Sequence, residues 1–502
     1  MMGPRRAALL AVALSLTACS SGAATASVSP AGTPSPPSSP SAGTSPEAPP
    51  SIAPAVCAAK APAHAVCGTI QAPLDYADSS KGDITLPLIR VPATDAANRV
   101  GSLLVNPGGP GASGVEFVAG QIGLFTSLNR RFDIVGFDPR GTGGPDAIHC
   151  LDTAALDHLV ATDPIADDPS EKQDLVDSAR RLAVGCQDLS GRLLPYVGTV
   201  NVARDMDRLR AALGEARISY LGFSYGTSIG VEYAAQFPTH IRAMVLDGNT
   251  DPSVSALDTG AQQAASLEHS FSDFAASCVQ HTSCPLGADP KGAIQKIIAG
   301  LDAHPVTVNR RSLGRGDALV ALVATMYDPT LWPTIATLFA RAQQGNYSGL
   351  QILEDAYDGR HADGFDRQLE SNTAINCADL ATPTDVATFD RKVAEVAPKY
   401  PDFGAAAIYG AITCAFWPVR GPAAAAVDVR GAPPILLVGA TNDPATPYTW
   451  SQSLHRQIRG SILLTRHGDG HPSYPNSSCV AGRVDSYLES LQAPADGTVC
   501  DS

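Results

Sequence analysis

Short apolar runs that alternate with helix-length segments constrain the fold of this chain more than any other feature. Runs that are bounded by turn residues and have no polar alternation are typical of strands buried on both faces. They cover 101–106, 132–137, 218–222, 244–246, 434–438 and 461–465, and a partly alternating outer strand is predicted at 83–91. Strands separated by helices predict an α/β fold, with a mostly parallel sheet covered by helices on both faces.

The segment 251–425 interrupts this rhythm, because it is mainly helix-like and carries four cysteines. We predict that it is a helical cap inserted into the α/β core. The core then has two parts, 56–250 and 426–502, of which the second ends in a C-terminal tail. A separate C-terminal domain is the alternative, but the strands at 434–438 and 461–465 would then have no sheet to join.

The first 18 residues have the pattern of a signal peptide. Arg5 and Arg6 precede an apolar run at 7–16, which is shorter than the ~20 residues that a membrane span requires. Leu16, Thr17 and Ala18 then lead to Cys19, in a pattern that resembles the bacterial lipobox. Cleavage before Cys19 would make this residue the lipidation site; an ordinary signal peptide, with Cys19 incidental, is the alternative.

The segment 19–55 is predicted to be a lipidated cysteine followed by a disordered stalk. Residues 20–54 are almost entirely Ser, Pro, Ala, Thr and Gly, with Glu47 as the only charge. Such a segment has no apolar surface to offset its ordering entropy. We therefore expect the folded part outside the cell membrane, anchored by a lipid or secreted, with the N-terminal lipid as its only membrane contact.

The cysteine count agrees with export, because eleven cysteines without Cys19 leave an even ten. Proximity along the chain suggests five bridges. They are Cys57–Cys67, Cys150–Cys186, Cys278–Cys284, Cys377–Cys414 and Cys479–Cys500. A zinc site is disfavoured because no C-x-x-C pair is present.

Composition limits the class of partner. The 502 residues are 44% hydrophobic and 17% charged, which allows a sizeable core, and the formal net charge is −14. Nucleic acids and anionic membranes need a Lys/Arg surface that displaces counterions, so neither is an expected partner. The sequence carries no signal for an oligomeric state.

The motif Gly222-x-Ser224-x-Gly226 follows the buried-type strand at 218–222 and precedes a helical stretch at 225–236. This is the context of a nucleophile elbow, in which a strained turn presents a serine hydroxyl at the carboxyl edge of the sheet. The helix N-terminus beneath it favours developing negative charge. We predict Ser224 as a nucleophile; a serine that merely caps a glycine-rich turn is the alternative.

A serine hydroxyl needs a base, and the base needs an orienting acid. Asp443 and His471 each follow the end of a predicted strand and come after the serine in the order serine, acid, histidine. His467 is an alternative base, and Asp469 is an alternative acid. A metal site formed by the two histidines is disfavoured, because the glycines between them oppose the helix that their spacing would require.

An acyl transfer also needs hydrogen-bond donors for the tetrahedral oxyanion. The backbone N–H of Tyr225, directly after the predicted nucleophile, is one candidate. The loop 107–111, Pro-Gly-Gly-Pro-Gly, follows the strand at 101–106 and is the expected source of the second. A simple tight turn is the alternative; a phosphate-binding loop is excluded because the Lys-Ser/Thr pair is missing.

Five segments together resemble the secreted bacterial tripeptidyl aminopeptidases, which are α/β-hydrolase peptidases related to the prolyl aminopeptidases. They are 106–114 (NPGGPGASG), 138–143 (DPRGTG), 222–227 (GFSYGT), 245–248 (VLDG) and 442–447 (NDPATP). The resemblance implies the α/β-hydrolase fold, with Ser224 as nucleophile, Asp443 as acid and His471 as base. It places Gly109 and Tyr225 at the oxyanion hole and implies no metal or organic cofactor.

Two departures affect what the resemblance implies about substrate binding. The loop begins Asn106-Pro107 where prolyl aminopeptidases usually have a histidine, although the tripeptidyl branch is similar to this chain. The pair of cap acids that prolyl aminopeptidases use for the substrate ammonium is not identifiable. The segment 375–379 resembles one of the tripeptidyl branch, which makes Asp379 a candidate for that role or, alternatively, for a structural role beside a disulfide.

The resemblance predicts a serine aminopeptidase that releases short peptides, with tripeptides as the expected product, from the N-termini of polypeptides. The same core chemistry serves esters, so an esterase or lipase acting on acyl esters is the second hypothesis. A catalytically inactive binding lipoprotein is the third.

Overall fold

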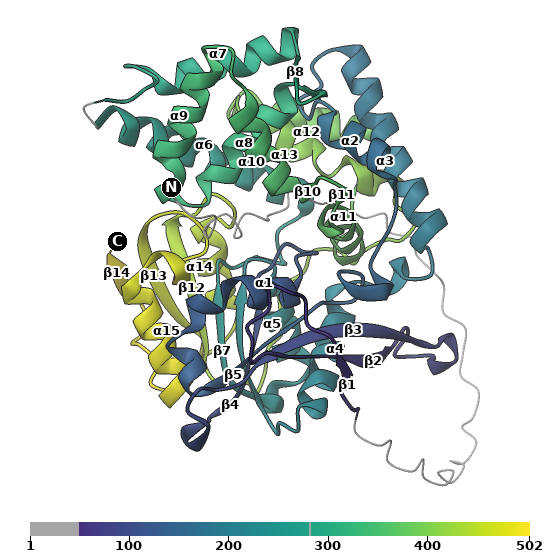
Figure 1. The fold of residues 1–502 in the computed structure, drawn as a ribbon, viewed down its shortest axis with the longest axis vertical. Helices are drawn as coiled ribbons and strands as arrows, with labels where there is room; N and C mark the ends of the chain where they lie inside the picture. The colour runs from purple at the N-terminus through teal and green to yellow at the C-terminus, as the bar shows by residue number, and fades with distance from the viewer. Residues whose placement is uncertain (1–49, 281–282, 502) are drawn as a thin grey trace, which may run out of the picture.

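The computed structural model describes residues 50–280 and 283–501, which form a large sheet beneath a helical layer (Figure 1). The predicted signal peptide, Cys19 and most of the predicted stalk lie outside the described residues. Ten strands form the sheet. In spatial order they are β1 (Ala53–Ala55), β2 (Val66–Pro73), β3 (Asp83–Val91), β5 (Phe132–Phe137), β4 (Gly101–Asn106), β6 (Ile218–Phe223), β7 (Ile241–Asp247), β12 (Ile435–Asn442), β13 (Ile462–Asp469) and β14 (Thr498–Asp501).

Strand direction divides the sheet into two parts. From β5 to β14 every neighbouring pair is parallel, whereas β1, β2 and β3 pair antiparallel at one edge. The predicted outer strand at 83–91 is β3, which pairs with β5 from Leu88↔Phe137 to Val91↔Ile134. The α/β-hydrolase fold expected from the sequence is therefore confirmed.

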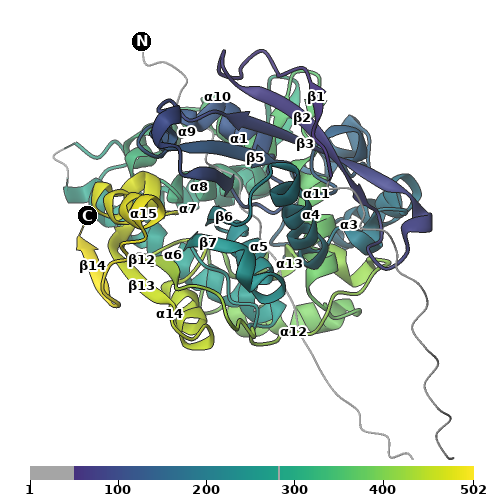
Figure 2. The same ribbon diagram turned by 90° about the horizontal axis from the view of Figure 1, so that it is seen from below.

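Helices cover both faces of the sheet (Figure 2). On one side lie α1 (Gly114–Gln121) and α15 (Ser478–Ser490), and on the other lie α4 (Thr199–Ala212), α5 (Gly226–Gln236) and α14 (Tyr448–Gln457). Successive strand residues point to opposite faces, so Leu103 and Val105 of β4 join the core under α1, while Leu104 joins the core under α5. This double burial explains why the strands read as uninterrupted apolar runs.

A helical layer lies over the carboxyl ends of the parallel strands (Figure 1). The chain between β7 and β12 supplies eight of its helices. They are α6 (Ala256–Gln280), α7 (Pro290–Ala303), α8 (Arg315–Met326), α9 (Trp332–Ala342), α10 (Ser348–Asp358), α11 (Gln368–Asp379), α12 (Val386–Val396) and α13 (Gly404–Tyr409). Two small hairpins, β8–β9 (Val306–Val308, Arg311–Leu313) and β10–β11 (Arg360–His361, Gly364–Phe365), complete the insertion.

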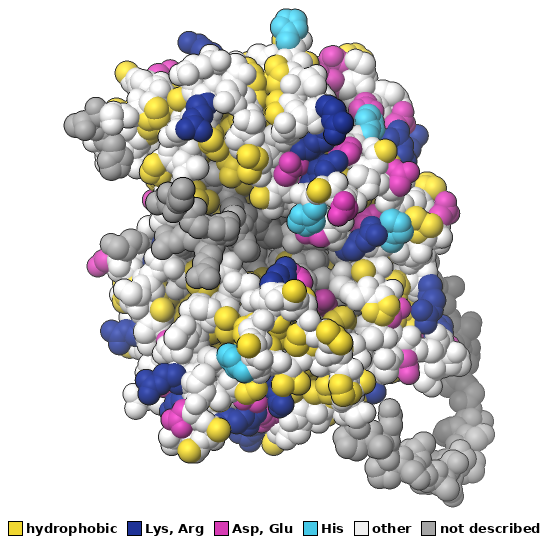
Figure 3. Space-filling model, in the orientation of Figure 1, with side chains coloured by type: hydrophobic (Ala, Val, Ile, Leu, Met, Phe, Trp, Pro, Cys, Tyr) yellow, Lys and Arg dark blue, Asp and Glu magenta, His cyan; other side chains and the backbone are white. Residues whose placement is uncertain are grey.

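Two further helices join this layer from the chain between β5 and β6, namely α2 (Thr153–Ala161) and α3 (Pro169–Ser190). Ion pairs connect them to the insertion, because Arg315 Nε lies 2.6 Å from Asp163 Oδ2 and Arg360 NH2 lies 3.0 Å from Asp157 Oδ2. On the face shown in Figure 3, basic and acidic side chains lie beside one another over this region and form no single basic patch.

All five disulfides that proximity suggested are formed. Bridges of this number indicate a protein that matures in an oxidising compartment outside the cytoplasm. The Cys377–Cys414 bridge fastens α11 to the short helix Ile412–Phe416. Among the described residues, no helix combines the length and the apolar character that crossing a bilayer requires.

Candidate active site

Ser224 lies in a sharp turn between the end of β6 at Phe223 and the start of α5 at Gly226. Its φ of 54° is in the left-handed region, which is strained for a residue with a Cβ atom. The backbone N–H of Ser224 donates to Asp247 O, at the end of β7, over 2.9 Å. These features are those of a nucleophile elbow at the carboxyl edge of the sheet.

Asp443 and His471 are joined by a buried hydrogen bond. Asp443 Oδ2 lies 2.8 Å from His471 Nδ1, and both side chains are almost completely buried. The other carboxylate oxygen, Oδ1, accepts from the backbone N–H groups of Ala445 and Thr446 at 2.9 and 2.7 Å. The carboxylate is therefore fixed in rotation and presents one oxygen to the imidazole.

The remaining contacts of His471 fix the plane of its ring. Its backbone N–H donates to Tyr327 O at 2.8 Å, and the ring of Tyr327 meets the imidazole edge to face with centroids 5.7 Å apart. Thr446 Oγ1 lies 3.2 Å from Nδ1. Gly248 lies beneath the ring, since a Cβ atom there would fall 2.4 Å from His471 Cε1. Within the described part of the chain, the buried Nε2 atom has no hydrogen-bond partner.

The three side chains share one rim because of strand order. The strands β6, β7, β12 and β13 are parallel neighbours, and Ser224, Asp443 and His471 each follow the end of one of them. Asp247, at the end of β7, connects the two ends of the site. Its backbone carbonyl holds Ser224, while its carboxylate accepts from the backbone N–H groups of Ser473 and Tyr474 at 3.0 and 2.6 Å. Burial raises the pKa of the Asp247 carboxyl to about 6.

The glycine loop that follows β4 packs directly on the elbow. A Cβ atom at Gly108 would lie 2.5 Å from Phe223 O and 2.8 Å from Ser224 Cβ, so only glycine fits at this position. Asn106 Oδ1 accepts from the Gly108 N–H at 2.9 Å and fixes the turn. Across residues 50–280 and 283–501, we find no intramolecular hydrogen bond from the backbone N–H of Gly109 or Tyr225. The two predicted oxyanion donors, which follow Gly108 and Ser224 in the chain, are thus unpaired in the described structure.

Asp379, at the carboxyl end of α11, contacts the residue after Ser224. Its Oδ1 accepts from the Thr199 N–H at 2.6 Å, and its Oδ2 lies 2.5 Å from Thr199 Oγ1 and 3.3 Å from the Tyr225 hydroxyl. Burial raises the pKa of Asp379 to about 6, although the hydrogen bonds from Thr199 act in the opposite direction. Both carboxylate oxygens are therefore engaged by donors of the chain itself.

The alternative base and the alternative acid lie elsewhere. His467 is largely exposed, and its Nδ1 lies 3.0 Å from Asp501 Oδ1 at the β13–β14 edge. Asp469 accepts from Asn442 Nδ2 at 3.1 Å, at the boundary with α6. Of His467 and His471, only His471 meets Asp443 in the described structure.

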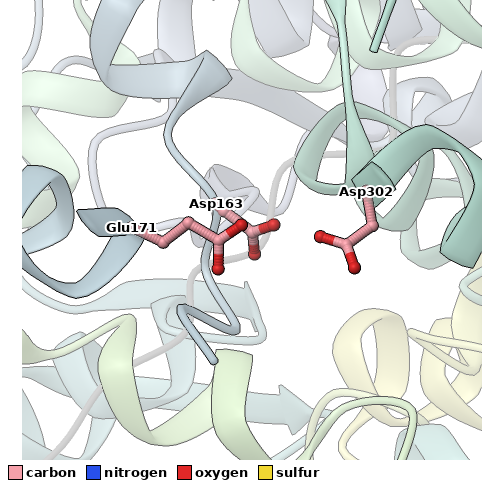
Figure 4. A group of neighbouring side chains, drawn as sticks. All are labelled: Asp163, Glu171 and Asp302. Carbon is pink, nitrogen blue, oxygen red and sulfur yellow. The ribbon is translucent and has the colours of Figure 1, made fainter. Parts of the chain in front are cut away.

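One cluster of acidic residues in the described part of the chain has the spacing of a metal site. Single oxygens of Asp163, Glu171 and Asp302 lie within 4.8 Å of one another (Figure 4). The guanidinium of Arg315 already binds all three, at 2.6 Å from Asp163, 3.1 Å from Asp302 and 3.5 Å from Glu171. An arginine thus supplies the positive charge for these carboxylates, and its ion pairs connect α8 to α3 and α7.

Sequence reasoning missed three residues around the site. Thr446 lies within the segment 442–447, where a hydroxyl three residues after the acid was an available signal. Tyr327 follows directly after α8, and Thr199 is the first residue of α4; their sequence surroundings contain no motif that points to the site.

The chain is similar in sequence to several known hydrolases. A family model described as "TAP-like protein" matches residues 400–500. The protein named serine protease Hip1 of Mycobacterium tuberculosis is 38% identical over 468 residues, which cover 88% of each chain. Carboxylesterase B of the same species is 36% identical over 86% of each chain. The tripeptidyl aminopeptidase of Streptomyces lividans is 31% identical over 86% of this chain and 83% of its own.

Proposed function

The chain belongs to the tripeptidyl-aminopeptidase-like family of α/β-hydrolase serine peptidases, and from this premise we propose that it releases short peptides, most simply tripeptides, from polypeptide N-termini. The observation that carries the proposal is the buried Asp443–His471 hydrogen bond at the same rim of the sheet as the strained Ser224. Its expected substrate class is peptides, in line with relatives named as a serine protease and a tripeptidyl aminopeptidase.

In this mechanism His471 Nε2 accepts the proton of the Ser224 hydroxyl as the oxygen attacks the peptide carbonyl. Nδ1 keeps its proton and donates a hydrogen bond to Asp443, whose negative charge stabilises the imidazolium. The tetrahedral oxyanion accepts from the N–H groups of Gly109 and Tyr225. His471 then gives its proton to the leaving amine, which breaks the C–N bond and leaves an acyl-enzyme. Water activated by the same imidazole releases the peptide acid.

The decisive experiment is digestion of a peptide library, with the cleavage position read by mass spectrometry. Cuts at a fixed number of residues from the N-terminus support an aminopeptidase, and cuts after the third residue support tripeptide release. N-acetylation of the substrates should abolish most of this activity, because it removes the terminal ammonium. Cuts at internal positions, independent of the N-terminus, would contradict the proposal.

Dependence on Ser224 is tested separately. We expect Ser224→Ala to lower kcat by at least about 10³-fold while leaving the folded state intact. A serine-directed phosphonate should inactivate the wild type by forming an adduct on Ser224, which mass spectrometry of the digested protein can locate. A Ser224→Ala protein with wild-type activity would refute the assigned nucleophile.

An esterase is the second candidate, because a relative named carboxylesterase B covers 86% of this chain. The same nucleophile and oxyanion donors accept an ester carbonyl, so the difference lies in substrate binding. Rates on free tripeptide anilides and on acyl esters of matched leaving-group pKa distinguish the two. A kcat/KM for simple acyl esters that exceeds the value for every free peptide would favour the esterase.

We also propose that the mature protein begins at Cys19 and carries a lipid on it. The supporting observations are the lipobox-like segment 16–19 and a disulfide set suited to an extracytoplasmic compartment. Mass spectrometry of the mature N-terminal peptide should find a diacylglyceryl group on Cys19. A soluble, unmodified N-terminus downstream of residue 19, in both wild type and Cys19→Ser, would contradict this proposal.

A further inference from the structure

The helix α11 contacts both segments that carry the proposed oxyanion donors. Asn372, in its middle, donates from Nδ2 to Pro110 O at 2.9 Å. The glycine loop packs on the same helix so closely that a Cβ atom at Gly111 would lie 2.8 Å from the backbone N of Asn372. At its carboxyl end, Asp379 reaches the Tyr225 side chain. One rigid element therefore spans the distance between the two donors.

The contact between Asp379 and Tyr225 is part of a closed network. Thr199 Oγ1 lies 2.5 Å from both the Tyr225 hydroxyl and Asp379 Oδ2, and Asp379 Oδ1 accepts from the Thr199 backbone N–H. Tyr225 is almost completely buried. Because its hydroxyl is held in this way, the outer end of the Tyr225 side chain is anchored by a network that includes a carboxylate of the cap.

The same helix is fastened at further points. Ser371 donates its hydroxyl hydrogen to Gly141 O at 2.7 Å. The Cys377–Cys414 disulfide fixes the carboxyl half. These bonds oppose sliding and rotation of α11, so they keep its two ends in constant relation to the sheet.

Position matters at an oxyanion hole, because a donor stabilises the transition state only when it lies about 2.7–3.1 Å from the developing oxyanion. We infer that α11 acts as a brace for the oxyanion hole, in which Asn372 positions the glycine loop and Asp379 positions the N–H of Tyr225. Both are positioning residues, since neither touches the reacting atoms. This inference rests on the proposed function, in which Ser224 is the nucleophile.

A brace and a substrate-binding site make different kinetic predictions. If Asp379 bound the substrate ammonium, its removal would weaken the binding of both substrate and product. If it positions Tyr225, its removal weakens the transition state alone, so kcat falls while KM is unchanged. The affinity of a peptide aldehyde reports on the stability of the transition state. Its adduct with Ser224 has a tetrahedral carbon whose oxygen lies in the oxyanion hole, whereas the free peptide product forms no such adduct.

The experiment compares Asp379→Asn, Tyr225→Phe and Asn372→Ala with the wild type on a p-nitroanilide and a p-nitrophenyl ester. For each variant we expect kcat to fall about 10- to 100-fold on both substrates, with KM within about twofold. The inhibition constant of the aldehyde should rise by the same factor as kcat falls, and that of the free peptide should not change. Asp379→Asn and Tyr225→Phe should be non-additive, because they break one network.

Thr373→Ala is the matched control, since Thr373 lies on the same helix and, among the described residues, its hydroxyl bonds only to Leu369 O within α11. It should retain wild-type kcat and aldehyde affinity. Thermal unfolding identifies any variant that fails to fold. Tyr225→Phe, which removes a single oxygen, and Asn372→Ala then decide the question independently of Asp379→Asn.

Two results would overturn the inference. Wild-type kcat and aldehyde affinity in folded Tyr225→Phe and Asn372→Ala would show that the oxyanion hole needs no brace. A higher KM and weaker product binding in Asp379→Asn, with unchanged kcat, would assign this carboxylate to the substrate instead. Either result leaves Ser224→Ala inactive, whereas failure of the proposed function leaves Ser224→Ala active, so the two failures are distinguishable.

Discussion

The carboxylate of Asp443 uses its two oxygens for different purposes. Oδ2 lies 2.8 Å from His471 Nδ1, and Oδ1 accepts the backbone N–H groups of Ala445 and Thr446. Because both N–H groups are donors, the atom that faces them must be a hydrogen-bond acceptor. A polar replacement at position 443 will therefore turn an oxygen toward them. This asymmetry determines what happens at the imidazole when the residue is changed.

We expect Asp443→Asn to lower kcat by about 10⁴-fold with little effect on folding. The amide oxygen will take the place of Oδ1, so the NH₂ group will face His471 Nδ1 and force that nitrogen to be an acceptor. The proton then sits on Nε2, where it cannot receive another from Ser224. Steady-state kinetics at several pH values measures the effect, and a fall of less than about tenfold would contradict it.

The buried pair Arg140–Asp205 should dominate the stability of the region around β2 and α4. The guanidinium contacts both Asp205 oxygens at 2.6 and 2.7 Å, and it also donates to Leu74 O and Pro73 O. We expect Arg140→Met to lower the free energy of unfolding by about 3–5 kcal/mol, because it leaves a buried carboxylate without its counter-charge. The double variant Arg140→Met/Asp205→Leu should recover part of this loss in urea unfolding, and no recovery would contradict the explanation.

The Cys377–Cys414 and Cys278–Cys284 bridges offer a matched comparison. They close chain separations of 37 and 6 residues. In the chain-entropy model the first stabilises the fold by about 4 kcal/mol and the second by about 2 kcal/mol. Replacing each pair by serine and measuring unfolding in urea should give the larger loss for Cys377–Cys414; equal losses would indicate that strain or unfolded-state structure outweighs loop length.

Rising pH should weaken the cap through Glu354 of α10. This side chain is 2% exposed, and burial together with Asp358, Asp317 and Asp355 raises its pKa to about 9. Between an unfolded pKa of about 4 and this value, the folded chain holds a proton that the unfolded chain has released. The free energy of unfolding therefore falls as pH rises through this window.

In Glu354→Gln the side chain has the shape of protonated glutamic acid and is uncharged at every pH. The free energy of unfolding of this variant should therefore fall less between pH 5 and pH 8 than that of the wild type. We expect a difference of about 4 kcal/mol over this interval, measured by urea unfolding at the two pH values. Asp188→Asn, at an exposed position on α3, is the control and should follow the wild type. A Glu354→Gln protein with the wild-type pH dependence would refute the assignment.

Much of the core was predictable, because strands buried on both faces need apolar residues at every position. The runs at 101–106, 132–137 and 218–222 correspond to β4, β5 and β6. The elbow was predictable for a local reason, since a strand, a strained turn and a helix follow one another within a few residues around Ser224. The five disulfides followed from proximity, because cysteines near in sequence have the smallest loops to close.

The surroundings of the site were not predictable in the same way. The cap presents Tyr327 to His471 and Asp379 to Tyr225 across 144 and 154 positions of the chain. No periodicity or spacing encodes such contacts, because they depend on how α8 and α11 pack above the sheet. The same holds for α2 and α3, whose sequences read as helices of the core although they lie in the cap layer.

By itself, the sequence determined the order of strands and helices, the elbow at Ser224 and the candidates Asp443 and His471. These features are local, since each depends on residues within one turn, strand or loop. Only the tertiary structure decided that His471 rather than His467 meets Asp443, and that both oxygens of Asp379 are occupied by Thr199 and Tyr225. The physical reason is that a hydrogen bond between distant residues is set by packing, which fixes positions to within a few tenths of an ångström.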